Sequence, residues 1–80
     1  MTLTAVDDDH FYIGGHLIDL VWISYQVRKK TTAANYHNMN RSLIWLRKFA
    51  LRLLAGEAEP TDETTARKML TTLGYGWYFE

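Results

Sequence analysis

The chain has 80 residues, of which 48% are hydrophobic and 14% aromatic, and its nine basic and nine acidic side chains cancel. A length of this order predicts one domain, over residues 1–80, and excludes a Rossmann fold or a TIM barrel. The absence of cysteine excludes a disulfide scaffold, a cysteine-based zinc module and a cysteine nucleophile. The apolar fraction is too high for a disordered chain.

Neither a membrane span nor a signal peptide is indicated. The longest apolar stretch, residues 17–27, contains Asp19 and falls short of the roughly 20 apolar residues that cross a bilayer. The beginning of the sequence carries Asp7, Asp8 and Asp9 where a signal peptide has a basic region. We therefore expect a cytoplasmic protein with no membrane contact.

The charged side chains are strongly segregated along the chain. Residues 1–27 hold four acids and neither lysine nor arginine, whereas residues 28–52 hold seven bases and no acid. Residues 53–80 hold five acids against two bases. Blocks of one sign indicate either a charged docking surface or charge complementarity within the molecule.

The first predicted element is a helix over residues 15–30. Its apolar side chains surround the whole helical wheel, so that periodicity alone does not distinguish a buried helix from a buried strand. The length of the run favours a helix, and three bases at its end suit the negative end of a helix dipole. Gly14 and Gly15 would start this helix or allow a close backbone approach.

The second predicted element, a helix over residues 33–55, has the clearest pattern. Apolar side chains recur at alternating spacings of three and four, as in a packed helical seam: Tyr36, Met39, Leu43, Leu46, Ala50 and Leu53. Ile44, Leu51 and Leu54 are expected to widen this core stripe. Thr32 or Asn35 can cap the start, and Gly56 suits the left-handed conformation that ends a helix.

The third predicted helix covers residues 62–73. Thr61 suits its N-cap, and Gly74 suits its end. An aromatic tail over residues 75–80 follows, and Phe11-Tyr12-Ile13 forms a second aromatic run near the beginning of the sequence. The sequence thus predicts a mainly α, small three-helix domain, in which the terminal aromatic segments could add a short two-stranded element.

No pattern of catalytic or metal-ligating residues is present. His10, His16 and His37 are scattered, and the aspartates of residues 7–9 lack the alternating ligands and turn glycine of a calcium loop. No serine lies on a nucleophile elbow, and Gly14-Gly15 lacks the spacing of a phosphate-binding loop. We therefore expect no enzymatic activity, no metal, no cofactor and no small-molecule substrate.

A basic face on the second helix is the main functional feature. Arg41, Trp45, Lys48 and Arg52 follow one another at spacings of four, three and four, which places them together, with Arg47 beside them. This face would contact phosphates, or dock on an acidic protein surface with Trp45 as its anchor. The third interpretation is a solvated face that the acidic ends of the same chain neutralise.

The aromatic tail allows two interpretations. Its side chains would complete a thin core, because a domain of this size is marginally stable, or they would anchor an interface. The candidate partner-binding residues are therefore Arg41, Trp45, Lys48, Arg52, Tyr75, Trp77, Tyr78 and Phe79. The candidate nucleic-acid-binding residues are Arg41, Arg47, Lys48, Arg52, Arg67 and Lys68.

Three functional hypotheses follow from these patterns. The first is a small non-enzymatic regulator or inhibitor that binds a larger protein with an acidic surface, a type common among accessory proteins of phages and mobile elements, such as host-takeover or anti-defence factors. The alternative is a helical nucleic-acid-binding regulator that uses the basic face. The third is a structural homo-oligomer, a homodimer for example, with Leu43, Leu46 and Leu53 in the self-contact.

Overall fold

The computed structural model of the chain describes residues 3–30 and 32–75. The described residues form a three-stranded antiparallel sheet, in the order β1-β2-β3, followed by three helices. The strands are β1 (Leu3–Ala5), β2 (His10–Ile13) and β3 (His16–Asp19), and the helices are α1 (Leu20–Lys30), α2 (Ala33–Leu54) and α3 (Pro60–Thr72). The predicted mainly helical class and its three helices are confirmed, but the sheet differs from the prediction.

The sheet has three strands rather than two, and all of them precede the helices. Residues 11–13 are extended, as predicted, but they pair with β1 and β3, with Tyr12 opposite both Thr4 and Leu17. Tyr75 follows α3 and takes no part in the described sheet. The rest of the predicted partner strand, residues 76–80, lies outside the described residues.

The prediction of a helix from residue 15 is wrong for its first turn. Gly14 and Gly15, with φ of 55° and 83°, form a two-residue loop that turns β2 back into β3. Helix α1 begins only at Leu20, because the Asp19 carboxylate accepts hydrogen bonds from the backbone N–H groups of Val21 and Trp22. Asp19 therefore caps a helix whose first N–H groups have no partner within the helix.

Helix α2 matches its predicted bounds to within one residue, and Gly56 follows its end with a φ of 72°. Its predicted seam faces the core, because Leu43, Leu46 and Ala50 are buried and the other seam residues pack against them. The predicted widening of this stripe is wrong. Ile44, Leu51 and Leu54 are exposed, and Phe49 occupies the core in their place.

Helix α3 starts two residues earlier than predicted, so the prediction of Thr61 as its N-cap is wrong. Glu59 is its N-cap and Pro60 its first residue, and Glu59 and Asp62 bond each other's backbone N–H groups in a capping box. Gly74 follows the end of α3 with a φ of 92°, as predicted. None of the described helices is long and apolar enough to cross a membrane.

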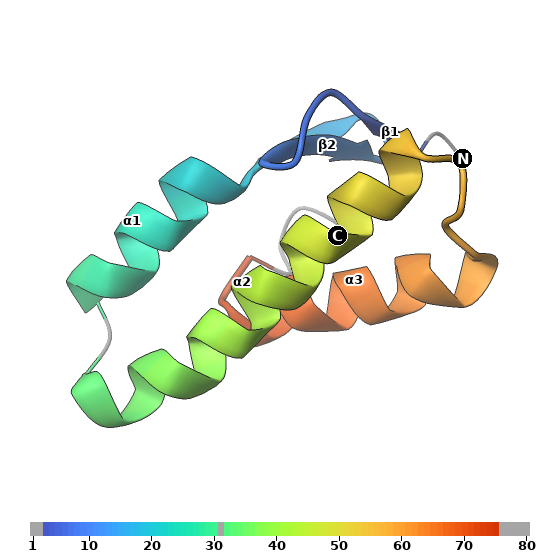
Figure 1. Cartoon of the computed structure of the whole chain (residues 1–80). Helices are drawn as coiled ribbons and strands as arrows, with labels where there is room; N and C mark the ends of the chain where they lie inside the picture. Colours follow the sequence, from blue (N-terminus) through green and yellow to red (C-terminus); the bar gives the residue numbers. More distant parts are fainter. Residues whose placement is uncertain (1–2, 31, 76–80) are drawn as a thin grey trace.

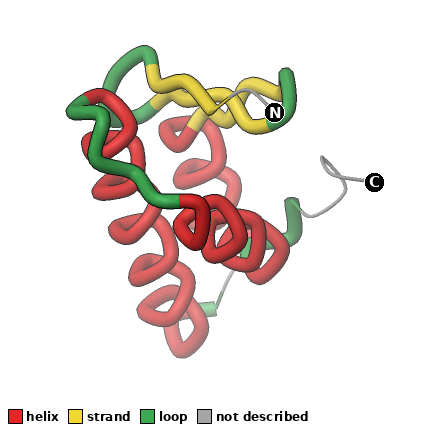
Figure 2. Tube along the Cα trace, turned by 90° about the vertical axis from the view of Figure 1, so that its right-hand side faces the viewer, coloured by secondary structure: helices red, strands yellow, loops and turns green. Residues whose placement is uncertain are grey.

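The core lies where the sheet meets the helices. Figure 1 shows α1 and α2 as an antiparallel pair, with the sheet at the end where α1 begins and α2 ends. Helix α3 packs against α2 and crosses it at an angle, as the turned view in Figure 2 also shows. Phe11 of β2 and Phe49 of α2 meet edge to face in the core, with ring centroids 5.4 Å apart.

Candidate functional site

The side of α2 that faces away from the core combines apolar and basic side chains. Arg41, Ile44, Lys48 and Leu51 follow one another at spacings of three, four and three, so they form one continuous row on the helix. All four are exposed, with Ile44 at 43% and Leu51 at 53% of their full accessible area. We call this row the α2 outer face.

The two bases of the outer face differ from the other bases of α2. Arg47 forms an ion pair with Asp9 at 3.0 Å, and Arg52 forms one with Asp62 at 2.7 Å. Within residues 3–30 and 32–75, neither Arg41 nor Lys48 forms an ion pair. The acidic blocks of the sequence therefore neutralise the bases that flank the outer face and leave those on it available.

The aromatic candidates Trp45 and Tyr75 are more buried than Arg41 and Lys48. Trp45 is half-buried and stacks on Phe49, with ring centroids 5.5 Å apart and the planes 12° from parallel. Tyr75 is buried and meets Trp22 edge to face at 5.7 Å. Both side chains thus contribute to packing, whereas Trp77, Tyr78 and Phe79 lie outside the described residues.

The candidate nucleic-acid-binding residues do not form one uniform basic patch. Arg67 of α3 lies 3.5 Å from Glu63, one turn earlier on the same helix, so it adds a third ion pair to those of Arg47 and Arg52. Lys68 is exposed on α3. Of the six bases predicted to contact phosphate, three are therefore bound to acids of the chain itself.

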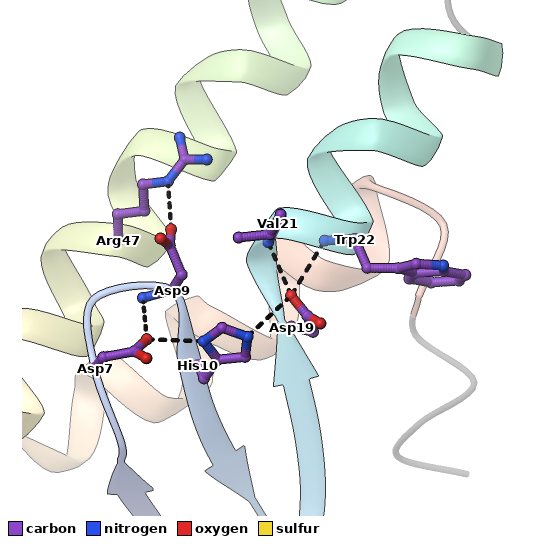
Figure 3. A network of polar contacts seen from close by, with 7 residues as sticks. All are labelled: Asp7, Asp9, His10, Asp19, Val21, Trp22 and Arg47. Atoms are coloured by element: carbon purple, nitrogen blue, oxygen red, sulfur yellow. Dashed lines mark hydrogen bonds and ion pairs between the residues drawn. The ribbon is translucent and has the colours of Figure 1, made fainter.

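A polar network at the junction of the sheet and α1 supports the Arg47 ion pair. Figure 3 shows the His10 ring between two carboxylates, with Nδ1 2.8 Å from Asp7 Oδ1 and Nε2 3.3 Å from Asp19 Oδ1. Asp7 also accepts a hydrogen bond from the backbone N–H of Asp9, whose own carboxylate binds Arg47. The network therefore connects the β1–β2 loop to the cap of α1 and to α2.

The contact between His10 and Asp7 shifts the pKa values of both side chains. The hydrogen bond to Asp7 raises the pKa of His10 above its ordinary value, and the nearby negative charges of Asp7, Asp19 and Asp9 add to this shift. The hydrogen bond from His10 in turn lowers the pKa of Asp7. Each partner therefore favours the charged form of the other.

The sequence prediction and the observed surface overlap in Arg41 and Lys48. It missed Ile44 and Leu51, because an apolar residue near a strong seam was assigned to the core. The available signal was the helical spacing, because Ile44 lies between Arg41 and Lys48 and Leu51 follows Lys48 by three residues, on the polar side of α2. Among the residues that the structure describes, no cluster of three metal-ligating side chains is present.

We compared the chain with protein-family models, with curated proteins and with solved structures, and it matches none of them. The functional interpretation therefore depends on the site itself.

Proposed function

We propose that the chain is a small non-enzymatic regulator or inhibitor that docks on an acidic surface of a larger protein through the α2 outer face. The supporting observation is the alternation of Arg41 and Lys48 with two exposed apolar side chains on one helical row. Arginine beside desolvated apolar groups is a frequent composition of the energetically dominant part of protein interfaces.

The charge of the outer face specifies the partner's chemistry. A partner surface with an apolar centre and carboxylates around it would bury Ile44 and Leu51 and neutralise Arg41 and Lys48. Such complementarity accelerates encounter and disfavours basic partners. A host protein with such a surface would fit a regulator of the phage or mobile-element type.

The two competing functions have less support. A nucleic-acid-binding protein needs several bases free to contact phosphates, and Arg47, Arg52 and Arg67 are in internal ion pairs. A homo-oligomer through the predicted seam needs exposed seam residues, and Leu43 and Leu46 are fully buried within the chain.

The first experiment measures nucleic-acid binding by fluorescence anisotropy, with a random duplex and a random single strand at about 50 and 200 mM salt, a range over which several phosphate contacts cost orders of magnitude in affinity. We expect no saturable binding at the lower salt concentration. Binding that collapses with salt and with Arg41→Glu/Lys48→Glu would replace our proposal with the nucleic-acid alternative.

The second experiment identifies the protein partner and maps its contact. Proteins captured by the tagged chain from a lysate of its natural source are purified, and their direct binding is measured by calorimetry. We expect Arg41→Glu/Lys48→Glu to weaken binding at least about tenfold, since each reversed charge faces a carboxylate in the complex. The control Lys29→Glu/Lys68→Glu makes the same change in net charge at exposed positions on α1 and α3.

Circular-dichroism melts establish that both double variants remain folded. Equal losses of affinity in the two variants would contradict a specific role for the outer face, and so would a captured partner whose affinity neither variant changes. Light scattering of the purified chain provides a further check, since a stable dimer that Ile44→Ser/Leu51→Ser dissociates would assign the outer face to self-association.

A further inference from the structure

A cavity beside α1 lies apart from the α2 outer face and has aromatic and apolar walls. It has a volume of about 400 Å³ and lies between α1, the first half of α2 and the residues that follow α3. This volume is within the range of roughly 300–1,000 Å³ that small-molecule sites occupy. Its lining residues are Trp22, Gln26, Val27, Lys30, Met39, Leu73, Gly74 and Tyr75.

One wall of the cavity is a single row of side chains on α1. Trp22, Gln26 and Lys30 are four residues apart, so they lie above one another on the helix. The Trp22 ring is fixed by its edge-to-face contact with Tyr75 and yet remains 47% exposed. The thioether of Met39, on α2, lines the cavity as well and suits contact with an aromatic ring.

Two polar side chains of α1, Gln26 and Lys30, line the cavity. In the part of the chain that the structure describes, the Gln26 amide and the Lys30 ammonium have no hydrogen-bond or ion-pair partner. The adjacent Lys29 differs, because its ammonium lies over the Tyr25 ring, 5.2 Å from the centroid. Aromatic and apolar walls with one amide and one cation suit a flat apolar molecule that carries an anionic group.

We propose that this cavity binds a small aromatic carboxylate, whose ring occupies the space beside Trp22 and Met39 and whose carboxylate binds Lys30 and Gln26. None of the four residues of the α2 outer face lines this cavity. The proposal is therefore independent of the docking function, and either one can fail without the other.

Titration with indole-3-acetate, followed by ¹H–¹⁵N NMR of the tryptophan indole N–H groups, tests the proposal on the full chain. The sequence has three tryptophans, and a Trp22→Phe variant assigns the Trp22 signal. We expect a saturable shift of that signal and a much weaker effect with tryptamine, which has the same ring but the opposite charge. Neutral indole should bind with intermediate affinity.

Two lysine variants test the role of the anionic group. We expect Lys30→Ala to weaken indole-3-acetate binding about tenfold, as loss of a charge-assisted contact does. Lys29→Ala removes the same charge one residue away, from a side chain that does not line the cavity, and should leave the Kd unchanged. Both lysines are exposed, so both variants should fold, which a melt confirms.

Three results would overturn the proposal. The first is the absence of a Trp22 shift at millimolar indole-3-acetate. The second is equal binding of tryptamine and indole-3-acetate, which would mean that the cavity does not select an anion. The third is an equal effect of the two lysine variants, which would reduce the interaction to general attraction by the basic end of α1.

Discussion

The two sides of α2 contain the same kinds of apolar residue but have different surroundings. On the inner side, Leu43 and Leu46 are completely buried, and Phe49 is 1% exposed. On the outer side, Ile44 and Leu51 are 43% and 53% exposed and lie in one row with Arg41 and Lys48. The comparison shows that hydrophobicity alone does not assign a residue to the core, because helical spacing decides which side it occupies.

Ion pairs mark the boundaries between these two sides. Arg47 is tied to the β1–β2 loop by Asp9, and Arg52 is tied to the start of α3 by Asp62. Arg47 follows Ile44 by three positions, and Arg52 follows Lys48 by four, so both arginines lie beside the outer face. Their ion pairs hold the β1–β2 loop and the start of α3 next to it. Arg47 and Arg52 thus connect α2 to neighbouring elements, whereas Arg41 and Lys48 form no ion pair within the part of the chain that the structure describes.

The largest expected effect is on the free energy of unfolding, when a side chain on either side of α2 is truncated to alanine. Phe49→Ala removes a ring that contacts both Phe11 and Trp45, and it should cost about 3–5 kcal/mol of unfolding free energy. A domain of this size has a stability of only about 3–5 kcal/mol, so this variant should be largely unfolded.

The matched control, Leu51→Ala on the outer face, should change the unfolding free energy by less than about 0.5 kcal/mol. Urea unfolding followed by circular dichroism measures both variants. Similar losses for Phe49 and Leu51 would contradict the assignment of the two sides of α2.

A smaller loss of unfolding free energy is expected when the ion pair between Arg52 and Asp62 is removed. The Asp62 carboxylate accepts the backbone N–H of Glu59 at 2.9 Å and binds Arg52 at 2.7 Å, through the same oxygen. Asp62→Ala removes part of a helix cap and an ion pair, and it should cost about 1–2 kcal/mol. Asp62→Asn keeps an acceptor for the cap and should lose less.

Urea unfolding again provides the measurement, with Glu57→Ala as the control. Glu57 is exposed in the same connector, and its side chain has no partner among the described residues, so its loss should have little effect. If Glu57→Ala and Asp62→Ala are equally destabilising, the Arg52 pair does not hold α3 against α2.

How far the sequence predicts this fold depends on how local each signal is. The extent of α2 and the end of α3 were predictable to within one residue, because apolar spacing and the closing glycines, Gly56 and Gly74, act within one or two turns. Residues 16–19 were mispredicted because a continuous apolar run has no period. The hairpin signal was nevertheless present, since Gly14-Gly15 separates two apolar segments by two residues.

The α2 outer face was only partly predictable, for a different reason. The spacing of Arg41 and Lys48 placed them together on α2, but it held no information on which bases would be neutralised. The Arg47–Asp9 pair joins residues 38 positions apart, and only the folded sheet brings them together. Packing likewise decides that one face of Trp45 stacks on Phe49.

The smallest effect that we expect is a pH dependence of stability from His10 and Asp7, in the loop whose Asp9 binds Arg47. The pKa of His10 is raised by its bond to Asp7, so the protonated ring stabilises the fold fully below its ordinary pKa of 6.5. This stabilisation is lost as the pH rises through the higher pKa of the folded state. The pKa of Asp7 is lowered, so its contribution is present above 3.8 and lost as the pH falls through the lower folded-state pKa.

Both contributions therefore coexist between about pH 4 and pH 6.5, and the melting temperature should decline from pH 6 to pH 8. His10→Asn should weaken this decline, because asparagine does not titrate and cannot bind Asp7 and Asp19 as a cation. His37→Asn, at an exposed position on α2 away from the carboxylates, should retain it. An unchanged pH profile in His10→Asn would show that the network does not contribute to the connection between the β1–β2 loop, α1 and Arg47.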